Sequence, residues 1–538
     1  MDSITRGAAP IKRVIGPPGT GKTTWITNRV QELCEIYGAG VDPVLVVSLT
    51  RTAAAEAAGR IKLNPKCVTT LHAQAFHALD GPEIAEGHVK EFATGRDDSD
   101  GGTIDLDEPS WEWGETQQSL YQRVQTLRAG LIPEDRWPLD ARSWSKNWTE
   151  WKGRRGYLDF SDLIERATTD TDMAPTGPLH ILVDEAQDFS AMELSLLRKW
   201  SVGCKSLTLV GDPMQALYTW RGSHPKMFQR DQAAEPPLIL TQSYRVPRAI
   251  HAKACKWARQ VSTWEQQDYQ PRDAHGVIVY ESGITVTQPD SLASLILRER
   301  AERKSVMVAA SCSYMIAPLV KALKRRAEPF ANPWRTKRGD WNPLGRSHGH
   351  SAADRVLALV DPPTHGRYWT WSDVSRWGQH LKSDGLLVRG GKSRLKELAS
   401  CPDRVEIHDL LGVFRPEPMS ALWGLAFDQK DEKRLLKWYA DHLLPAHWRV
   451  AEYAIKIATT HGLAALKSPP RIYVGTVHSF KGAEADVVVL MPNLSARGGQ
   501  AWLGAGDRDG VIRMAYVGMT RAREKLIITG GTPPYLEL

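Results

Sequence analysis

The sequence predicts an α/β fold with parallel sheets. Three short apolar runs have the character of buried strands: one ends at Val14 and Ile15, one covers residues 181–183, and one covers 207–210. The first run is followed by a glycine-rich turn and then by a helix-like segment, 24–37. The second run is followed by a pair of acids, and the third by Gly211-Asp212. Ligands of open α/β sheets bind at the carboxyl edge, so we expect these polar residues to share one site.

The glycine-rich turn matches the pattern G-x-x-x-x-G-K-S/T. Its glycines let the backbone N–H groups point at phosphate oxygens, with the amino end of a helix behind them. Lys22 is expected to reach the β- and γ-phosphates, and Thr23 to offer its hydroxyl to Mg²⁺. A glycine-rich turn without a ligand is the alternative, and the flanking strand and helix count against it. The residues expected to bind ATP are Gly16, Pro17, Pro18, Gly19, Thr20, Gly21, Lys22, Thr23 and Thr24.

Two adjacent carboxylates are the candidates for metal binding and catalysis. Asp184 and Glu185 directly follow the apolar run 181–183. Asp184 suits Mg²⁺ coordination, and Glu185 suits a base that orients the attacking water. A solvated acidic loop is the competing interpretation. We favour hydrolysis of the nucleotide over binding alone, because the acids end a buried strand in a chain that already has a P-loop.

Composition restricts the class of protein only loosely. The chain has 538 residues, enough for three or four folded units, and a formal net charge of +7 from 69 basic and 62 acidic residues. That excess is compatible with a nucleic-acid groove without requiring one. No apolar run is long enough to span a membrane, and no signal peptide is recognisable, so we expect a cytoplasmic protein. The six scattered cysteines lack C-x-x-C spacing and are expected to be reduced.

Eight segments, in order, resemble the motifs of UvrD/Rep/PcrA-like DNA helicases of superfamily 1. They are 45–56 (LVVSLTRTAAAE), 69–72 (TTLH), 158–164 (LDFSDLI), 184–188 (DEAQD), 211–222 (GDPMQALYTWRG), 240–245 (LTQSYR), 476–484 (TVHSFKGAE) and 515–522 (AYVGMTRA). The resemblance runs from near the first residue to near the last. It implies two RecA-like P-loop lobes with the nucleotide between them.

The resemblance also implies roles around the nucleotide. Gln215 would sense the γ-phosphate, Tyr244 would stack on adenine, and Glu484 would contact the sugar. Arg245 and Arg521 would act as arginine fingers, which suit phosphoryl oxygens because the guanidinium is planar. One departure is that residues 1–13 contain no Gln, whereas the family reads adenine with a Gln-containing segment before the P-loop.

A second set of residues is implied to contact single-stranded DNA. Aromatic faces stack on any base, so Tyr218 and Trp220 suit tracking along a strand without sequence preference. Packing in a core is the alternative for both rings. Leu71 stands where many relatives have a stacking Phe. The expected strand-contacting residues are Thr50, Arg51, His72, Tyr218, Trp220, Arg221 and His478.

The motif order predicts that each lobe is interrupted by a mainly helical insertion. The first lobe would comprise 1–76 and 157–244, and the second 245–333 and 470–538. The insertions would be 77–156, with a helix near 117–127, and 334–469, with helices near 433–443 and 449–466. The insertions are rich in tryptophan, and we expect most of these side chains to be structural, because small helical units need large apolar residues to form a core.

The function that the resemblance implies is ATP-dependent, 3′-to-5′ movement on single-stranded DNA that unwinds tailed duplexes. Three alternatives remain: a translocase that strips proteins from DNA, an RNA-directed motor, and an ATPase switch subunit of a larger complex.

Seventeen residues follow Arg521, so we expect no fused nuclease. A separate nuclease or a repair or replication protein is a candidate partner, and we expect a monomer in its absence.

Overall fold

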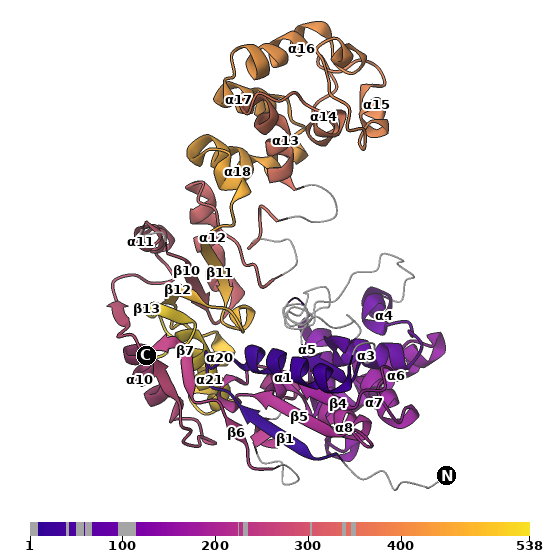
Figure 1. Cartoon of the computed structure of the whole chain (residues 1–538), viewed down its shortest axis with the longest axis vertical. Helices are drawn as coiled ribbons and strands as arrows, with labels where there is room; N and C mark the ends of the chain where they lie inside the picture. The colour runs from indigo at the N-terminus through magenta and orange to yellow at the C-terminus, as the bar shows by residue number, and fades with distance from the viewer. Residues whose placement is uncertain are drawn as a thin grey trace.

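The computed structural model describes residues 9–38, 42–49, 59, 67–94, 115–223, 225–229, 235–301, 304–335, 341–345 and 351–538. Two α/β units lie side by side at the base of the molecule, and a group of helices stands beyond them at the far end of the long axis (Figure 1). Among the described residues, no helix combines the length and the apolar character needed to cross a bilayer.

The first sheet has six parallel strands in the order β3-β2-β4-β5-β1-β6. They are β1 Ile11–Ile15, β2 Val44–Ser48, β3 Val68–Thr70, β4 His180–Val183, β5 Ser206–Gly211 and β6 Leu238–Ile239. Alternate residues of these strands enter two different apolar clusters, so both faces of the sheet are buried. Helix α1 covers one face, and α3, α7 and α8 cover the other. The helices of this unit are α1 Lys22–Tyr37, α3 Leu71–Ala78, α7 Phe160–Asp170, α8 Ala191–Trp200 and α9 Pro225–Gln229.

The second sheet has five parallel strands in the order β11-β10-β12-β13-β9. They are β9 Val277–Glu281, β10 Val306–Ala310, β11 Ile472–Thr476, β12 Ala485–Leu490 and β13 Ala522–Thr529. Helices α11 and α12 cover one face, and α10 and α21 cover the other. The helices are α10 Arg248–Ala258, α11 Pro289–Arg300, α12 Ser313–Arg325, α20 Ala496–Trp502 and α21 Arg508–Met519. Strands β7 Gln242–Pro247 and β8 Gln270–Arg272 pair beside this sheet. The predicted parallel α/β fold is therefore confirmed.

A small helical unit lies between α3 and α7. It contains α4 Val89–Thr94, α5 Glu115–Ala129 and α6 Leu139–Arg155, with the short turns η2 Ala85–His88 and η3 Glu134–Arg136. Trp137, Trp144 and Trp148 are buried and are the three largest side chains of its core. The predicted helix at 117–127 is confirmed, and these three tryptophans are structural as expected. Trp111 and Trp113 lie outside the described residues.

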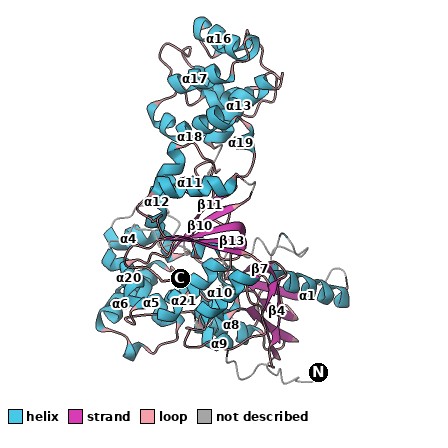
Figure 2. Cartoon of the chain, turned by 90° about the vertical axis from the view of Figure 1, so that its left-hand side faces the viewer, coloured by secondary structure: helices cyan, strands magenta, loops and turns pink. Residues whose placement is uncertain are grey.

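A second helical group extends beyond the second sheet, and its Tyr453 and Ile457 share an apolar cluster with β10 and β11 (Figure 2). It contains α13 Ala352–Thr364, α14 Trp371–Gly378, α15 Gly391–Glu397, α16 Pro416–Trp423, α17 Glu432–His442, α18 Pro445–His461 and α19 Ala464–Lys467, with the short 3₁₀ helix η7 Asp409–Gly412 and the short π-helix η8 Gly424–Asp428. Its own core includes Trp369 and Trp377. The predicted helix 433–443 matches α17. The single helix predicted for 449–466 is wrong: it begins earlier, at Pro445, and breaks at Gly462, whose φ of +79° ends α18.

Candidate active site between the two lobes

The P-loop joins β1 to α1 and forms a cradle of backbone N–H groups. Gly16 N–H donates to the Gly211 carbonyl (2.9 Å), and Lys22 Nζ donates to the Gly16 carbonyl (2.8 Å). A Cβ on Gly16 would lie 2.4 Å from Lys22 Cγ, and Gly19 and Gly21 have φ values of +76° and +81°, so the loop requires its glycines. Helix α1 has no side-chain cap and no acid in its first turn. This donor set fits the phosphates of a nucleotide.

The two predicted acids follow β4 at the carboxyl edge of the sheet. Asp184 is held by its N–H, which donates to the Val47 carbonyl (2.8 Å), and Glu185 has a left-handed φ of +53°. Burial, reinforced by Glu185, raises the pKa of Asp184 to about 7. Burial also opposes ionisation of Glu185, but Lys481 and Lys22 outweigh it and lower its pKa to about 2. Lys481 and Lys22 therefore favour the ionised form of Glu185, while burial shifts the pKa of Asp184 in the opposite direction.

A chain of hydrogen bonds leads from the acidic pair into the second lobe. Gln187 Nε2 donates to Glu185 Oε2 (2.6 Å), and Gln187 Oε1 accepts from the Asp212 N–H (2.9 Å). Gln215 Nε2 then donates to Asp212 Oδ2 (2.7 Å), and Gln215 Oε1 accepts from Arg521 Nη2 (2.8 Å). Gln215 and Arg521 are thus brought together as the resemblance implied, although 306 positions separate them. Gln187 and Asp212 extend the predicted site.

The other predicted arginine and Glu484 form an ion pair. Arg245 Nε donates to Glu484 Oε2 (2.7 Å), and Arg523 Nη1 donates to Glu484 Oε1 (2.9 Å). Arg521 is fully buried, and burial, with the like charge of Arg245, lowers its pKa to about 9. Arg245 lies directly against the P-loop, since a Cβ on Gly19 would be 2.5 Å from Arg245 Cβ. Glu484, predicted to contact the sugar, is here the partner of two arginines.

The segment before Arg245 rests on the P-loop itself. Ser243 Oγ and Tyr269 Oη both donate to the Pro18 carbonyl (2.9 and 2.8 Å), and the Tyr244 N–H donates to the Gly19 carbonyl (2.8 Å). The Tyr244 ring is 70% exposed beside the loop. This arrangement places the predicted adenine-stacking ring next to the phosphate cradle. Tyr269 lies outside the eight matched segments and was not predicted.

Lys481 is a further charged residue of this site that sequence reasoning did not assign. It forms ion pairs with Asp188 and with Glu185 (3.6 Å) across the lobe boundary, and its Nζ lies 5.5 Å from the centre of the Tyr218 ring. Burial lowers its pKa to about 8. The position of Lys481 within the matched segment 476–484 could have indicated a role in the site. The sequence does not indicate which acids Lys481 contacts.

Four of the predicted strand-contacting residues lie together. The Tyr218 ring is 6.3 Å from Trp220, 6.2 Å from His478 and 5.7 Å from the Arg221 guanidinium. Tyr218 is buried, with 6% of its surface exposed, whereas Trp220 is 36% exposed. Trp220 thus presents more of its ring to solvent than Tyr218 does.

The remaining strand-contacting candidates are separate. His72 lies in α3, with Nδ1 3.8 Å from Glu193 Oε1, and burial lowers its pKa. Thr50 and Arg51 lie outside the described residues.

Comparisons with known families agree with this geometry. A profile described as an AAA domain matches residues 4–221, and one described as a UvrD-like helicase C-terminal domain matches 471–529. Both matches support the resemblance to the UvrD/Rep-like helicases of superfamily 1. The first profile covers the P-loop and the acidic pair, and the second covers Lys481, Glu484 and Arg521.

Several curated relatives are about a quarter identical to this chain over the residues that align. It is 27% identical over 267 residues to a probable DNA helicase of Mycoplasma pneumoniae, covering 44% of this chain and 50% of the relative. It is 27% identical over 296 residues to the ATP-dependent DNA helicase UvrD1 of Mycobacterium tuberculosis, covering 47% and 38%. It is 26% identical over 263 residues to DNA helicase II of Escherichia coli, covering 43% and 36%. The alignments thus span between about a third and a half of the relatives' length.

Proposed function

We propose that the chain is a motor that hydrolyses ATP to move on single-stranded DNA, 3′ to 5′, and to open tailed duplexes. The observation that carries this proposal is the chain of contacts from Glu185 through Gln215 to Arg521. It joins the predicted hydrolytic acid to the opposite lobe. The same loop of the first lobe continues directly into the Tyr218–Trp220 cluster. The names of the curated DNA helicases support the choice of DNA as the track.

The proposed division of labour follows the geometry. The P-loop and Lys22 would bind the phosphates, and Thr23 and Asp184 would hold Mg²⁺. Glu185, ionised at neutral pH, orients the attacking water and accepts its proton. Arg245 and Arg521 approach the γ-phosphate from the second lobe and stabilise the charge that develops there. Bound Mg²⁺ would neutralise phosphate charge beside these groups.

Movement would come from the lobe boundary. We propose lobes at 1–76 with 157–244 and at 245–333 with 470–538, with 77–156 and 334–469 as insertions. Because Arg521 and Gln215 belong to different lobes, occupation and emptying of the nucleotide site would change the distance between the lobes. Stacking residues on the 218–221 segment, which is continuous with Gln215, would then change their grip on the strand.

The test is ATP turnover by the full chain with and without oligo-dT. We expect single-stranded DNA to raise turnover, and Lys22→Ala to abolish both rates because the phosphates lose their principal cation. A control with oligo-U distinguishes DNA from RNA as the track. Turnover that ignores single-stranded DNA would contradict the motor and favour an ATPase switch instead.

A further inference from the structure

The end of helix α5 contacts the turn that carries the predicted stacking residues. Thr126 Oγ1 lies 2.8 Å from the Trp220 carbonyl oxygen and 2.8 Å from the carbonyl oxygen of Gln122, so its hydroxyl is shared between the turn and its own helix. Gly222 closes the turn at a φ of +88°. A Cβ on Gly222 would lie 2.7 Å from Ala129 Cβ. The turn 219–222 is therefore seated directly on the last two turns of α5.

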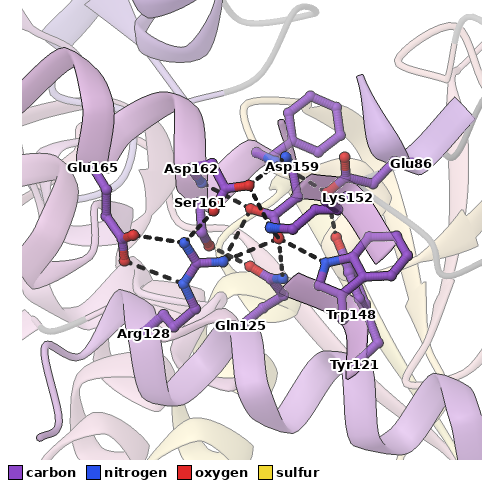
Figure 3. Close-up of polar contacts among 11 residues, drawn as sticks. Glu86, Tyr121, Gln125, Arg128, Trp148, Lys152, Asp159, Ser161, Asp162 and Glu165 are labelled. Carbon is purple, nitrogen blue, oxygen red and sulfur yellow. Dashed lines mark hydrogen bonds and ion pairs between the residues drawn. The ribbon is translucent and has the colours of Figure 1, made fainter. Parts of the chain in front are cut away.

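The same end of α5 is fixed to the first lobe by buried charge (Figure 3). Arg128 donates to both oxygens of Asp159 (3.1 and 3.0 Å), to Asp162 (2.6 Å) and to Glu165 (2.7 Å). Lys152 of α6 reaches the same two aspartates. Asp159 also forms a capping box with Asp162 at the start of α7, whose apolar face lies in the lobe's core. Helix α5 therefore cannot shift without breaking this network.

The second lobe contacts the turn from another side. Thr219 Oγ1 donates to Asp507 Oδ2 (2.6 Å), and Asp507 caps α21 by accepting from the Gly510 N–H (2.8 Å). Tyr218 packs in the apolar cluster of the second lobe with Val477 and Phe480. The turn thus has one attachment to α5 and another to the lobe that would move.

We propose that helix α5 holds the strand-contacting turn on the first lobe and that Thr126 is the positioning residue that sets where Trp220 meets a nucleobase. The small helical unit between α3 and α7 thereby acts in the grip on the strand as well as in packing. This inference rests on the proposed function, since it names how the stacking turn of that same motor is held.

The first experiment compares Thr126→Val, which keeps the shape and removes the hydroxyl, with Thr126→Ser, which keeps the hydroxyl. In Thr126→Val we expect the oligo-dT concentration for half-maximal stimulation of ATP turnover to rise roughly three- to tenfold, the range of one lost hydrogen bond. Turnover without DNA and the KM for ATP should not change. Thr126→Ser should restore wild-type behaviour, and Arg123→Gln, which breaks an exposed pair on the same helix, is the matched control. Wild-type DNA dependence in Thr126→Val, or equal loss in Thr126→Ser, would overturn the proposal.

The second experiment needs no DNA. Arg221 and Gly222 donate their N–H groups to the Tyr218 and Thr219 carbonyls, so amide hydrogen exchange reports directly on the turn. We expect faster exchange of these amides in Thr126→Val and wild-type exchange in Thr126→Ser. Equal protection in all three proteins would overturn the positioning role. A wild-type chain whose turnover ignores single-stranded DNA would instead refute the proposed function, while the exchange comparison would still decide whether α5 holds the turn.

Discussion

Glu86 illustrates, at the scale of one residue, how burial changes the chemistry of a carboxyl group. It is almost fully buried, and its Oε1 accepts from Tyr121 Oη (2.6 Å) and from the Phe160 N–H (3.0 Å). Burial, reinforced by Asp159, raises its pKa to about 8. For Asp159, the charges of Arg128 and Lys152 outweigh burial and lower the pKa. Two neighbouring acids thus hold opposite protonation states at neutral pH.

Glu86 should make the stability of the chain depend on pH. Its folded pKa lies above the ordinary value of 4.5, so the folded state binds the extra proton. The resulting stability is complete below about 4.5 and is lost as the pH rises through about 8. We predict that the thermal unfolding midpoint of the wild type falls between pH 6 and 9 and that Glu86→Gln flattens this fall. The control is Glu150→Gln, at an exposed pair with Arg154. Parallel pH profiles for wild type and Glu86→Gln would contradict the assignment.

Individual site residues can be predicted from the sequence where a short local motif defines their role. Lys22 and Asp184 lie where the P-loop and the acid-ended strand predicted them. The partners of Glu484 and Lys481 could not be predicted, because Arg245 and Asp188 are more than two hundred positions away and approach only when the lobes pack. The residues of the nucleotide cradle are adjacent in the sequence, whereas the charged residues around the cradle come from distant parts of the chain.

At the scale of elements, helices α5, α6 and α7 form one charged unit. The pattern predicted the helix near 117–127, and the structure extends it through Ala129. What no pattern indicated is that Arg128 at its end faces three carboxylates across a buried junction. Such pairing depends on how the helices pack. The end of α18 at Gly462 was not predicted, because the apolar periodicity continues past this glycine. The positive φ of Gly462 nevertheless stops the helix there.

Removal of Arg128 should be costly. Arg128→Gln leaves Asp159 and Asp162 paired with Lys152 and removes the Arg128 partner of Glu165. We predict a loss of about 3–5 kcal/mol of unfolding free energy, the usual cost of stripping one partner from a buried ion network. Denaturant unfolding followed by circular dichroism measures it. Arg123→Gln, on the exposed face of the same helix, should cost below about 1 kcal/mol. Equal losses in both variants would show that the network contributes no more than a surface pair.

At the scale of the molecule, the site forms because the two lobes pack against each other. The sequence predicted both parallel sheets and the order of their motifs. It did not predict that Met214, Leu217 and Tyr218 of the first lobe would enter the apolar core of the second. It indicated a helical insertion at 334–469, but not that α13 to α19 would lie far from the P-loop (Figure 1). Such placements depend on long-range packing that apolar periodicity does not encode.

Lys481 is the most direct probe of contact between the lobes. Lys481→Met leaves Glu185 and Asp188 without their cross-lobe cation. We predict that DNA-stimulated kcat falls roughly 10²-fold, the lower end of what a positioned catalytic base contributes, because Glu185 loses the cation that favours its ionised form. Binding of a non-hydrolysable ATP analogue, which relies on the P-loop, should be retained. Lys481→Arg is the control because it preserves the charge. A wild-type kcat in Lys481→Met would mean that this contact has no part in turnover.

The measurement that most directly tests the central claim is strand displacement by the full chain on three matched duplexes: 3′-tailed, 5′-tailed and blunt, each with Mg²⁺ and ATP. The account predicts opening of the 3′-tailed duplex alone, and no opening of any duplex by Lys22→Ala. Failure of the wild-type chain to open any of them would contradict the account of an autonomous helicase.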